Sequence, residues 1–215
     1  MRWLAVPLLV LALVGCGGAR EHGTAKLWVT RDRGAHVLYS GTVPAGLTAM
    51  QALERRLHVS TRYGGRFVQS IDGIGGSLSG QRDWLYFVNG IEVGVGATEV
   101  HLRPGDVEWW DYRSWKGSGF SVPVVVGAFP EPFRHGFEWA KPGARVTGTG
   151  PSVRKLQALV GRRGPNAIVV SATAPAGSAV ATRAGGAVRL VLGTKAAARL
   201  AADPSVLRYR YEVTG

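Results

Sequence analysis

The most informative segment of the sequence is Trp84-Leu85-Tyr86-Phe87-Val88-Asn89-Gly90, an aromatic strand that ends in a turn signal. Asn-Gly after a run of strand-forming residues is the strongest short-range indication of a β-hairpin. Successive side chains of a strand point to opposite faces, so Trp84, Tyr86 and Val88 share one face and the residues between them share the other. If only one side of the sheet is covered, an exposed aromatic face would suit a flat ligand. The alternative is that the second half of the chain covers that face.

Upstream of this strand, the sequence predicts a β-hairpin and one short helix. Strand-forming residues at 26–30 and 35–42 flank a turn-like Arg-Asp-Arg-Gly, as in a hairpin. Thr48 is a suitable N-cap, and Gln51 three residues later completes a capping box. A helix is therefore expected to start after Thr48 and to pack on the sheet.

Further short strands are predicted at 66–71, 99–102 and 107–112. Asp72-Gly73 and Pro104-Gly105-Asp106 are turns between them. Strands, one helix and then more strands indicate the α+β class, which we interpret as a β-grasp-like sheet that clasps one helix.

The motifs of this region are similar to those of a known family. In order along the chain stand Phe67-Val68-Gln69-Ser70-Ile71-Asp72-Gly73, the aromatic strand quoted above, Gly96-Ala97, Pro104-Gly105-Asp106 and Trp110-Asp111-Tyr112. This succession resembles the domain similar to the carboxy-terminal domain of transcobalamin. The resemblance implies a domain over residues 25–116 that binds a small ligand, with cobalamin or another corrinoid as the first candidate.

Candidate ligand contacts are the aromatic and turn residues of these motifs. They are Trp84, Tyr86, Asn89, Gly90, Trp110 and Tyr112. Asn89-Gly90 is also explained by the turn alone. The Asp-x-His-x-x-Gly arrangement that supplies a cobalt ligand in some cobalamin enzymes is absent from the sequence, so we expect a corrinoid to be held by shape and stacking.

The second half, residues 119–215, reads as a small α/β domain. The apolar run at 121–127 predicts a buried central strand. The remaining predicted elements are a helix from Pro151-Ser152 to Gly161, strands at 167–172 and 187–192, a helix at 194–202 and a last strand at 208–213.

The aromatic loop at 129–137 is a secondary site candidate. Open α/β sheets place ligands at the carboxyl ends of strands, and this loop follows the predicted central strand. Its candidate residues are Glu131, Arg134 and His135. The alternative is a structural loop that docks the two domains together.

The amino terminus predicts export and lipid attachment. Arg2 precedes an apolar stretch at 3–14, which is too short to span a bilayer of about 30 Å. Leu13-Val14-Gly15-Cys16 resembles the bacterial lipobox, which implies a removed signal peptide at 1–15 and a lipid on Cys16. Residues 16–24 would then tether the protein to the extracytoplasmic face of the cell membrane, and the alternative is an ordinary secretory signal.

The charge balance constrains the partners. There are 26 Lys and Arg against 14 Asp and Glu, a formal charge of +12, and one cysteine. Because export excludes a nucleic-acid partner, we expect anionic lipid headgroups, acidic cell-wall polymer or an anionic small molecule. A basic surface that serves only solubility is the alternative.

Catalytic motifs are missing from the sequence. No Gly-x-Ser-x-Gly or His-Glu-x-x-His is present, and the five histidines are not spaced as metal ligands. Asp72 and Asp106 are adequately explained as turn residues. We therefore predict a binding protein with no catalytic or metal site that passes its ligand to an importer. The alternatives are a cell-envelope adaptor for polysaccharide or a partner protein, and a hydrolase that uses Glu131.

Overall fold

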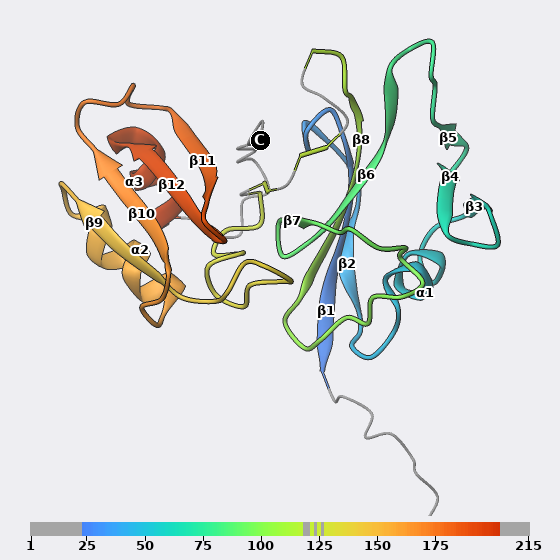
Figure 1. Ribbon diagram of the computed structural model, residues 1–215, viewed down its shortest axis with the longest axis horizontal. Coiled ribbons are helices and arrows are strands. Elements are labelled where there is room, and N and C mark those ends of the chain that lie inside the picture. The colour runs from blue at the N-terminus through green and yellow to red at the C-terminus, as the bar shows by residue number, and fades with distance from the viewer. Residues whose placement is uncertain (1–22, 118–120, 123, 126, 203–215) are drawn as a thin grey trace, which may run out of the picture.

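The computed structural model describes residues 23–117, 121–122, 124–125 and 127–202, which form two lobes (Figure 1). The predicted signal peptide, Cys16 and the predicted strand at 208–213 lie outside the described residues. Over the described part of the chain, no helix has the length and apolar character needed to cross a membrane.

The first lobe is built on a five-stranded sheet with the order β2-β1-β8-β6-β7. Its strands are β1 (Thr24–Arg31), β2 (His36–Pro44), β6 (Arg82–Val88), β7 (Ile91–Glu92) and β8 (Val107–Ser114). β1 and β2 form the predicted antiparallel hairpin, and β8 lies parallel to β1 and antiparallel to β6. The predicted turn at Asn89-Gly90 joins β6 to β7, with positive φ angles of 51° and 77°.

One short helix, α1 (Ala49–Glu54), packs on this sheet. The predicted capping box is confirmed, because Gln51 N donates to Thr48 Oγ1 at 3.1 Å and Thr48 N donates to Gln51 Oε1 at 3.0 Å. Met50 and Leu53 are buried against the sheet. The helix thus begins where its sequence predicts.

A second, three-stranded sheet lies beside α1. It consists of β3 (Val59–Arg62), β4 (Phe67–Ile71) and β5 (Ile74–Gly75). Val68 and Ile71 of β4 join the core of the main sheet. The first lobe therefore has few helices and mostly strands, in agreement with the α+β class.

The predicted strand at 99–102 is wrong. The segment makes one isolated bridge, between Thr48 and His101, and belongs to none of the sheets in the described residues. Its backbone instead holds the entry to α1, because Val100 O accepts from Ala49 N at 2.8 Å and Leu102 N donates to Leu47 O at 2.9 Å.

The predicted central strand at 121–127 is also wrong in the described residues. Val122 and Val125 are buried, but they cover the outer face of the main sheet around Phe87 and Trp109. Val124 makes only an isolated bridge to Ile91. An apolar run indicates burial, but burial alone does not distinguish a paired strand from a connector.

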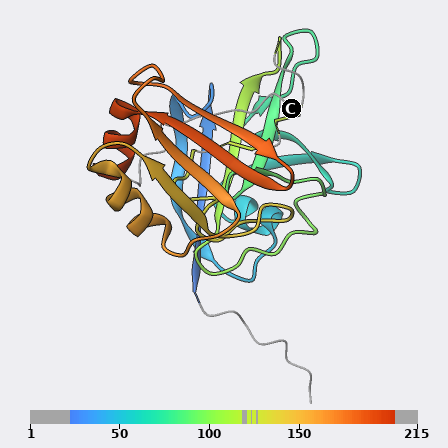
Figure 2. The same cartoon turned by 60° about the vertical axis from the view of Figure 1, so that its left-hand side comes forward.

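The second lobe is a four-stranded sheet covered on one face by two helices (Figure 2). Its elements are β9 (Ala144–Gly148), α2 (Ser152–Val160), β10 (Asn166–Ser171), β11 (Ala179–Ala184), β12 (Ala187–Gly193) and α3 (Thr194–Ala202). In the order β11-β12-β10-β9, the last three strands are parallel and β11 is antiparallel to β12. Both predicted helices are present, as are the strands predicted at 167–172 and 187–192, whereas β9 and β11 were not predicted.

Residues 127–143 connect the lobes and pack between them. Phe129 and Phe133 belong to the same buried cluster as Ile91 of β7 and Leu156 of α2. This loop gives the two lobes a shared apolar junction.

Candidate ligand-binding groove

The predicted aromatic ligand face is part of the core. Trp84, Trp110 and Tyr112 are only 7%, 4% and 8% exposed. They pack with the buried residues of α1 and β4, and Tyr86 stacks on Trp110 with ring centroids 4.6 Å apart. Among the described residues these strands therefore present no exposed aromatic strip, because α1 and the small sheet cover one face while the connector around Val122 and Val125 covers the other.

The polar atoms of two of these rings also serve the fold. Trp84 Nε1 donates to the carbonyl oxygen of Ile74 at 2.8 Å, and the Tyr112 hydroxyl donates to that of Gly75 at 3.0 Å. Both acceptors belong to β5. These rings thus pin the small sheet to the large one.

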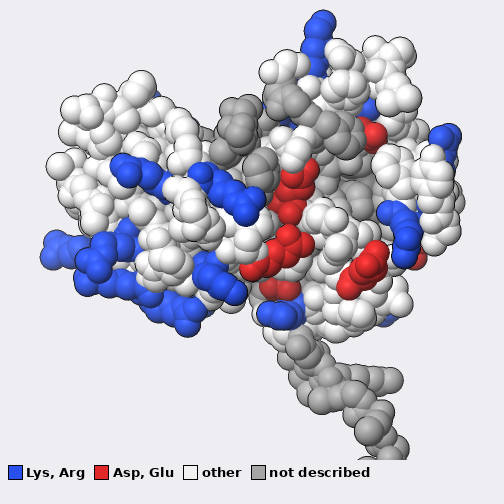
Figure 3. Space-filling view, in the orientation of Figure 1, with Lys and Arg blue, Asp and Glu red and all other residues white. Residues whose placement is uncertain are grey.

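A groove of about 1580 Å³ opens at the other end of the first lobe, against the connecting loop. Three segments distant in sequence form its walls, at 44–47, 100–106 and 135–142, and Gly23 and Arg55 complete the rim. Figure 3 shows acidic side chains exposed along the junction between the lobes, beside a second lobe whose charged surface is basic.

Asn89 joins the walls of the groove from behind. Its buried Nδ2 donates to Asp106 Oδ1 at 2.8 Å and to the carbonyl oxygen of Gly136 at 2.9 Å. Its Oδ1 accepts from Val107 N at 2.9 Å, and Asp106 Oδ2 accepts from Arg103 N at 2.8 Å. One predicted ligand residue is thus a buried structural link between two walls.

Gly90, the other predicted turn contact, is covered by the connector. Val125 N donates to Gly90 O at 2.7 Å, and a Cβ on Gly90 would lie 2.2 Å from the Val125 carbonyl oxygen. Only glycine fits this close approach with a φ of 77°.

Of the secondary candidates, His135 lines the groove, Glu131 lies buried behind it, and Arg134 is exposed outside the lining. Nδ1 of His135 lies 2.6 Å from Oε1 of Glu131, and His135 N donates to Oε2 at 3.0 Å. The hydrogen bond to Glu131 raises the pKa of His135, and the negative charge of Asp106 adds to this while burial and Arg134 oppose it. The sequence nominated both residues as site candidates but did not indicate which of them faces the groove.

The groove combines charged and apolar surface. Arg55, Arg103 and Lys141 are exposed on its rim together with His101, and the carboxylates of exposed Glu138 and buried Asp106 also line it. Its apolar lining includes Leu47, Val100, Leu102, Phe137 and Ala140. Such a surface can bury an apolar ligand body while the rim pairs with an anionic group.

A buried acid lies on the core face of β8. Glu108 is fully buried and accepts a 2.5 Å hydrogen bond from Trp110 Nε1. Burial holds the pKa of its carboxyl well above the usual range, against the lowering effect of that hydrogen bond. Burial also raises the pKa of Tyr86, and the nearby Glu108, Glu138 and Glu99 raise it further. Sequence alternation puts Glu108 on the face of Trp110 and Tyr112, so its burial could have been predicted.

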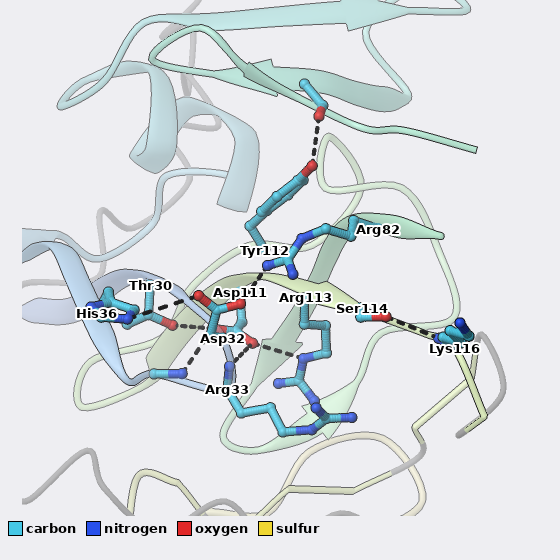
Figure 4. Close-up of polar contacts among 12 residues, drawn as sticks. Thr30, Asp32, Arg33, His36, Arg82, Asp111, Tyr112, Arg113, Ser114 and Lys116 are labelled. Carbon is cyan, nitrogen blue, oxygen red and sulfur yellow. Dashed lines mark hydrogen bonds and ion pairs between the residues drawn. The ribbon is translucent and has the colours of Figure 1, made fainter. Parts of the chain in front are cut away.

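The opposite end of β8 carries a structural polar cluster (Figure 4). Buried Asp111 accepts from Thr30 Oγ1 at 2.5 Å, from the backbone N–H groups of Arg33 and Gly34 at 2.9 Å, and from Arg113 Nε at 2.8 Å. These bonds fasten the β1–β2 turn to the central strand. We assign this cluster to the fold because a buried carboxylate is stable only when its oxygens are paired in this way.

Among the residues that the structure describes, no group of three or more His, Cys, Asp or Glu could hold a metal ion. Asp72 accepts from His58 N at 2.8 Å, and Asp106 is held by Asn89 and Arg103. Each carboxylate thus organises its own loop.

Comparison with known proteins gives a family match for part of the first lobe. Residues 46–114 match the profile described as Domain of unknown function (DUF4430), which spans α1 through β8. No curated protein sequence matches the chain.

Two solved structures are distant neighbours. One is a protein from Ruminococcus gnavus ATCC 29149 for which metal binding has been suggested, with 14% identity and a TM-score of 0.36, covering 43% of this chain and 98% of that one. The other is haptocorrin in complex with Cbi, with 16% identity and a TM-score of 0.37, covering 43% of this chain and 25% of that one. Similarities this distant establish neither a family nor a ligand for this chain.

Proposed function

We propose that this chain is an exported, lipid-anchored binding protein that holds a small ligand in the groove between the 44–47, 100–106 and 135–142 segments. The main support for this proposal is that Asn89 and Asp106 fix the walls by buried hydrogen bonds. The groove is therefore formed before a ligand binds. A preformed site binds without the free-energy penalty of ordering its walls.

The lining indicates the chemistry of the ligand. A volume of about 1580 Å³ exceeds the roughly 300–1,000 Å³ of sites for drug-sized molecules, so we propose a large ligand. The apolar residues suit a ring system, and Arg103, Lys141 and His135 suit a phosphate or carboxylate. A corrinoid with a phosphodiester, such as cobalamin, is the first candidate, and an importer would receive it.

The anchor is proposed from the amino-terminal sequence alone. Mass spectrometry of the protein purified from bacterial membranes would give a mature chain that starts at a diacylglycerol-modified Cys16. A mature chain cut elsewhere, or an unmodified Cys16, would overturn the anchor and leave the groove untouched.

Calorimetric titration of the full chain in detergent with cobalamin and with cobinamide, which lacks the phosphodiester, tests the ligand. We expect saturable binding of cobalamin that Arg103→Ala and His135→Gln each weaken about 10-fold or more, because a hydrogen bond to a charged group contributes about 1.5–3 kcal/mol. Arg134→Ala is the matched control, since Arg134 neighbours His135 but does not line the groove. Absence of binding to both corrinoids would sink the corrinoid proposal and favour the envelope-adaptor alternative.

A further inference from the structure

The second lobe has an extreme charge distribution. Residues 139–202 contain ten Lys and Arg and not one Asp or Glu. The basic excess of the chain is therefore concentrated in this lobe, although basic residues are spread along the whole sequence. Within it, Lys and Arg side chains gather on one surface along α2, at the lower left of Figure 3.

We define the basic face as four exposed side chains on α2 and the turn that follows it. They are Arg154, Lys155, Arg162 and Arg163. The turn after α2 is adjacent to the start of β9, because Ala144 N donates to the carbonyl oxygen of Arg162 at 3.2 Å, and Gln157 bridges α2 to Ala144. These bonds hold the cationic groups on one rigid surface.

The shape of this face distinguishes between polyanions. Leu156 and Val160 of α2 are buried against the sheet, so the helix presents its polar side outward. No Trp, Tyr or Phe occurs between residues 140 and 202 to stack on a sugar or a base. A convex cationic helix side without aromatic residues suits a broad, planar anionic surface rather than a threaded polymer.

The position of the basic face indicates which surface this is. α2 runs along the lower edge of the second lobe, at the same end of the molecule where the chain enters the first lobe at residue 23 (Figures 1 and 2). Seven residue steps separate Cys16 from Gly23 and reach at most about 25 Å. An anchor at Cys16 would thus keep this end of the molecule close to the membrane.

From the charge, shape and position of the face, we infer that it binds the anionic phospholipid surface of the membrane. Each Lys or Arg near such a surface contributes about tenfold or less to the partition coefficient, and salt screens the attraction. The inference goes beyond the proposed ligand site, and of the proposed function it uses only the anchor at Cys16. Attachment through both Cys16 and the basic face would fix the orientation of the groove relative to the membrane.

A single fluorescent label tests this inference in the full chain. Since Cys16 is the only cysteine, the Cys16→Ser chain accepts an environment-sensitive dye at one introduced position. Ala158→Cys places the dye on the exposed side of α2, and Ala172→Cys places it after β10, at the opposite end of that strand from the turn after α2. The same apolar amino terminus is present in every variant.

We expect the dye at position 158 to report an apolar interface on vesicles with 30% phosphatidylglycerol and not on pure phosphatidylcholine, while position 172 stays silent on both. Glutamine at Arg154, Lys155, Arg162 and Arg163 together should weaken the response at least tenfold. The matched control places glutamine at four exposed basic residues of the first lobe, Lys26, Arg62, Arg66 and Lys116. That control should respond as the parent does.

Three results would overturn the inference. They are no response at position 158, an equal response on both vesicles, and an undiminished response after the α2 substitutions. Soluble poly(glycerol phosphate) is tested at the same phosphate concentration without vesicles. If it gives an equally large response, the face binds an acidic polymer instead. None of these results bears on ligand binding in the groove, which is measured without vesicles.

Discussion

Asn89 Nδ2 donates to Asp106 Oδ1 at 2.8 Å, and both side chains are buried where the connecting loop meets the first lobe. The same Nδ2 reaches the carbonyl oxygen of Gly136. One side chain in a β-turn therefore ties together two walls of the groove, and the turn that defines the first lobe also positions the loop that completes the site.

Asn89→Ala should lower the free energy of unfolding by about 3 kcal/mol, because it leaves Asp106 Oδ1, Gly136 O and Val107 N without their partner. Chemical denaturation measures this loss. Asn166→Ala is the comparison, since Asn166 is equally buried and bonds Lys141 O, Gly143 O and Val188 N. Both variants should lose stability, but Asn89→Ala should increase proteolysis around Gly136, whereas Asn166→Ala should increase it around Lys141 and Gly143. Equal cleavage around Gly136 in the two variants would contradict the role of Asn89 at the groove.

Gly90→Ala should destabilise the protein by more than Gly73→Ala. Both glycines have a φ of 77°, so each alanine carries the same backbone strain of about 1–2 kcal/mol. A Cβ on Gly73 meets nothing within 4 Å, whereas one on Gly90 would lie 2.2 Å from the Val125 carbonyl oxygen. Thermal unfolding of the pair should show a difference of at least about 1 kcal/mol. Equal losses would mean that the connector does not lie on Gly90.

Glu108→Gln should stabilise the protein at neutral pH. Because burial raises the folded pKa of Glu108 above its unfolded value, the protonated carboxyl contributes fully below about pH 4.5 and that contribution is lost as pH rises toward the folded pKa. Within this window the difference between variant and parent should grow by about 1.4 kcal/mol per pH unit. Glutamine retains an acceptor for Trp110. Urea unfolding at pH 4, 5.5 and 7 measures the trend, and a pH-independent difference would show that Glu108 is not buried as described.

The Glu131–His135 pair should matter most at low pH. Glu131 raises the folded pKa of His135, so the stability from the ion pair is fully present below the unfolded pKa of about 6.5 and is lost as pH rises through the folded value. NMR titration should find the pKa of His135 above 6.5, and lower in Glu131→Gln. Glu131→Gln should also destabilise the protein more at pH 6 than at pH 9. A His135 pKa unchanged by that substitution would contradict the pairing.

Local signals predicted the parts of the fold that depend on neighbouring residues. The Thr48–Gln51 capping box, the Asn89-Gly90 turn and the β1–β2 hairpin each rest on contacts within a few residues along the chain. The incorrect predictions concern long-range packing, that is, which segment covers which face of a sheet. Val122 and Val125 are apolar because they cover a sheet face, and no local pattern separates that role from a central strand.

The candidate site shows the same difference between local features, which the sequence predicts, and long-range packing, which it does not. The aromatic strand was recognised, but whether its faces are exposed depends on α1, the small sheet and the connector, which come from elsewhere in the chain. The groove is made by three segments separated by tens of residues, so sequence alone could nominate His135 and Glu131 but not Arg103 or Phe137. The Asn-Gly pattern predicted the turn at Asn89 correctly, while the bond from Asn89 to Gly136 required the tertiary structure.

We propose that the ligand sits in the groove and not on the aromatic face of β6 and β8. Backbone NMR of the full chain in detergent, recorded during titration with cobalamin, distinguishes these two locations. We predict saturable shifts of the amides within 44–47, 100–106 and 135–142, with those of Trp84 and Tyr112 unchanged. Shifts centred on Trp84, Trp110 and Tyr112 would instead place the ligand on the aromatic strands and rule out the groove.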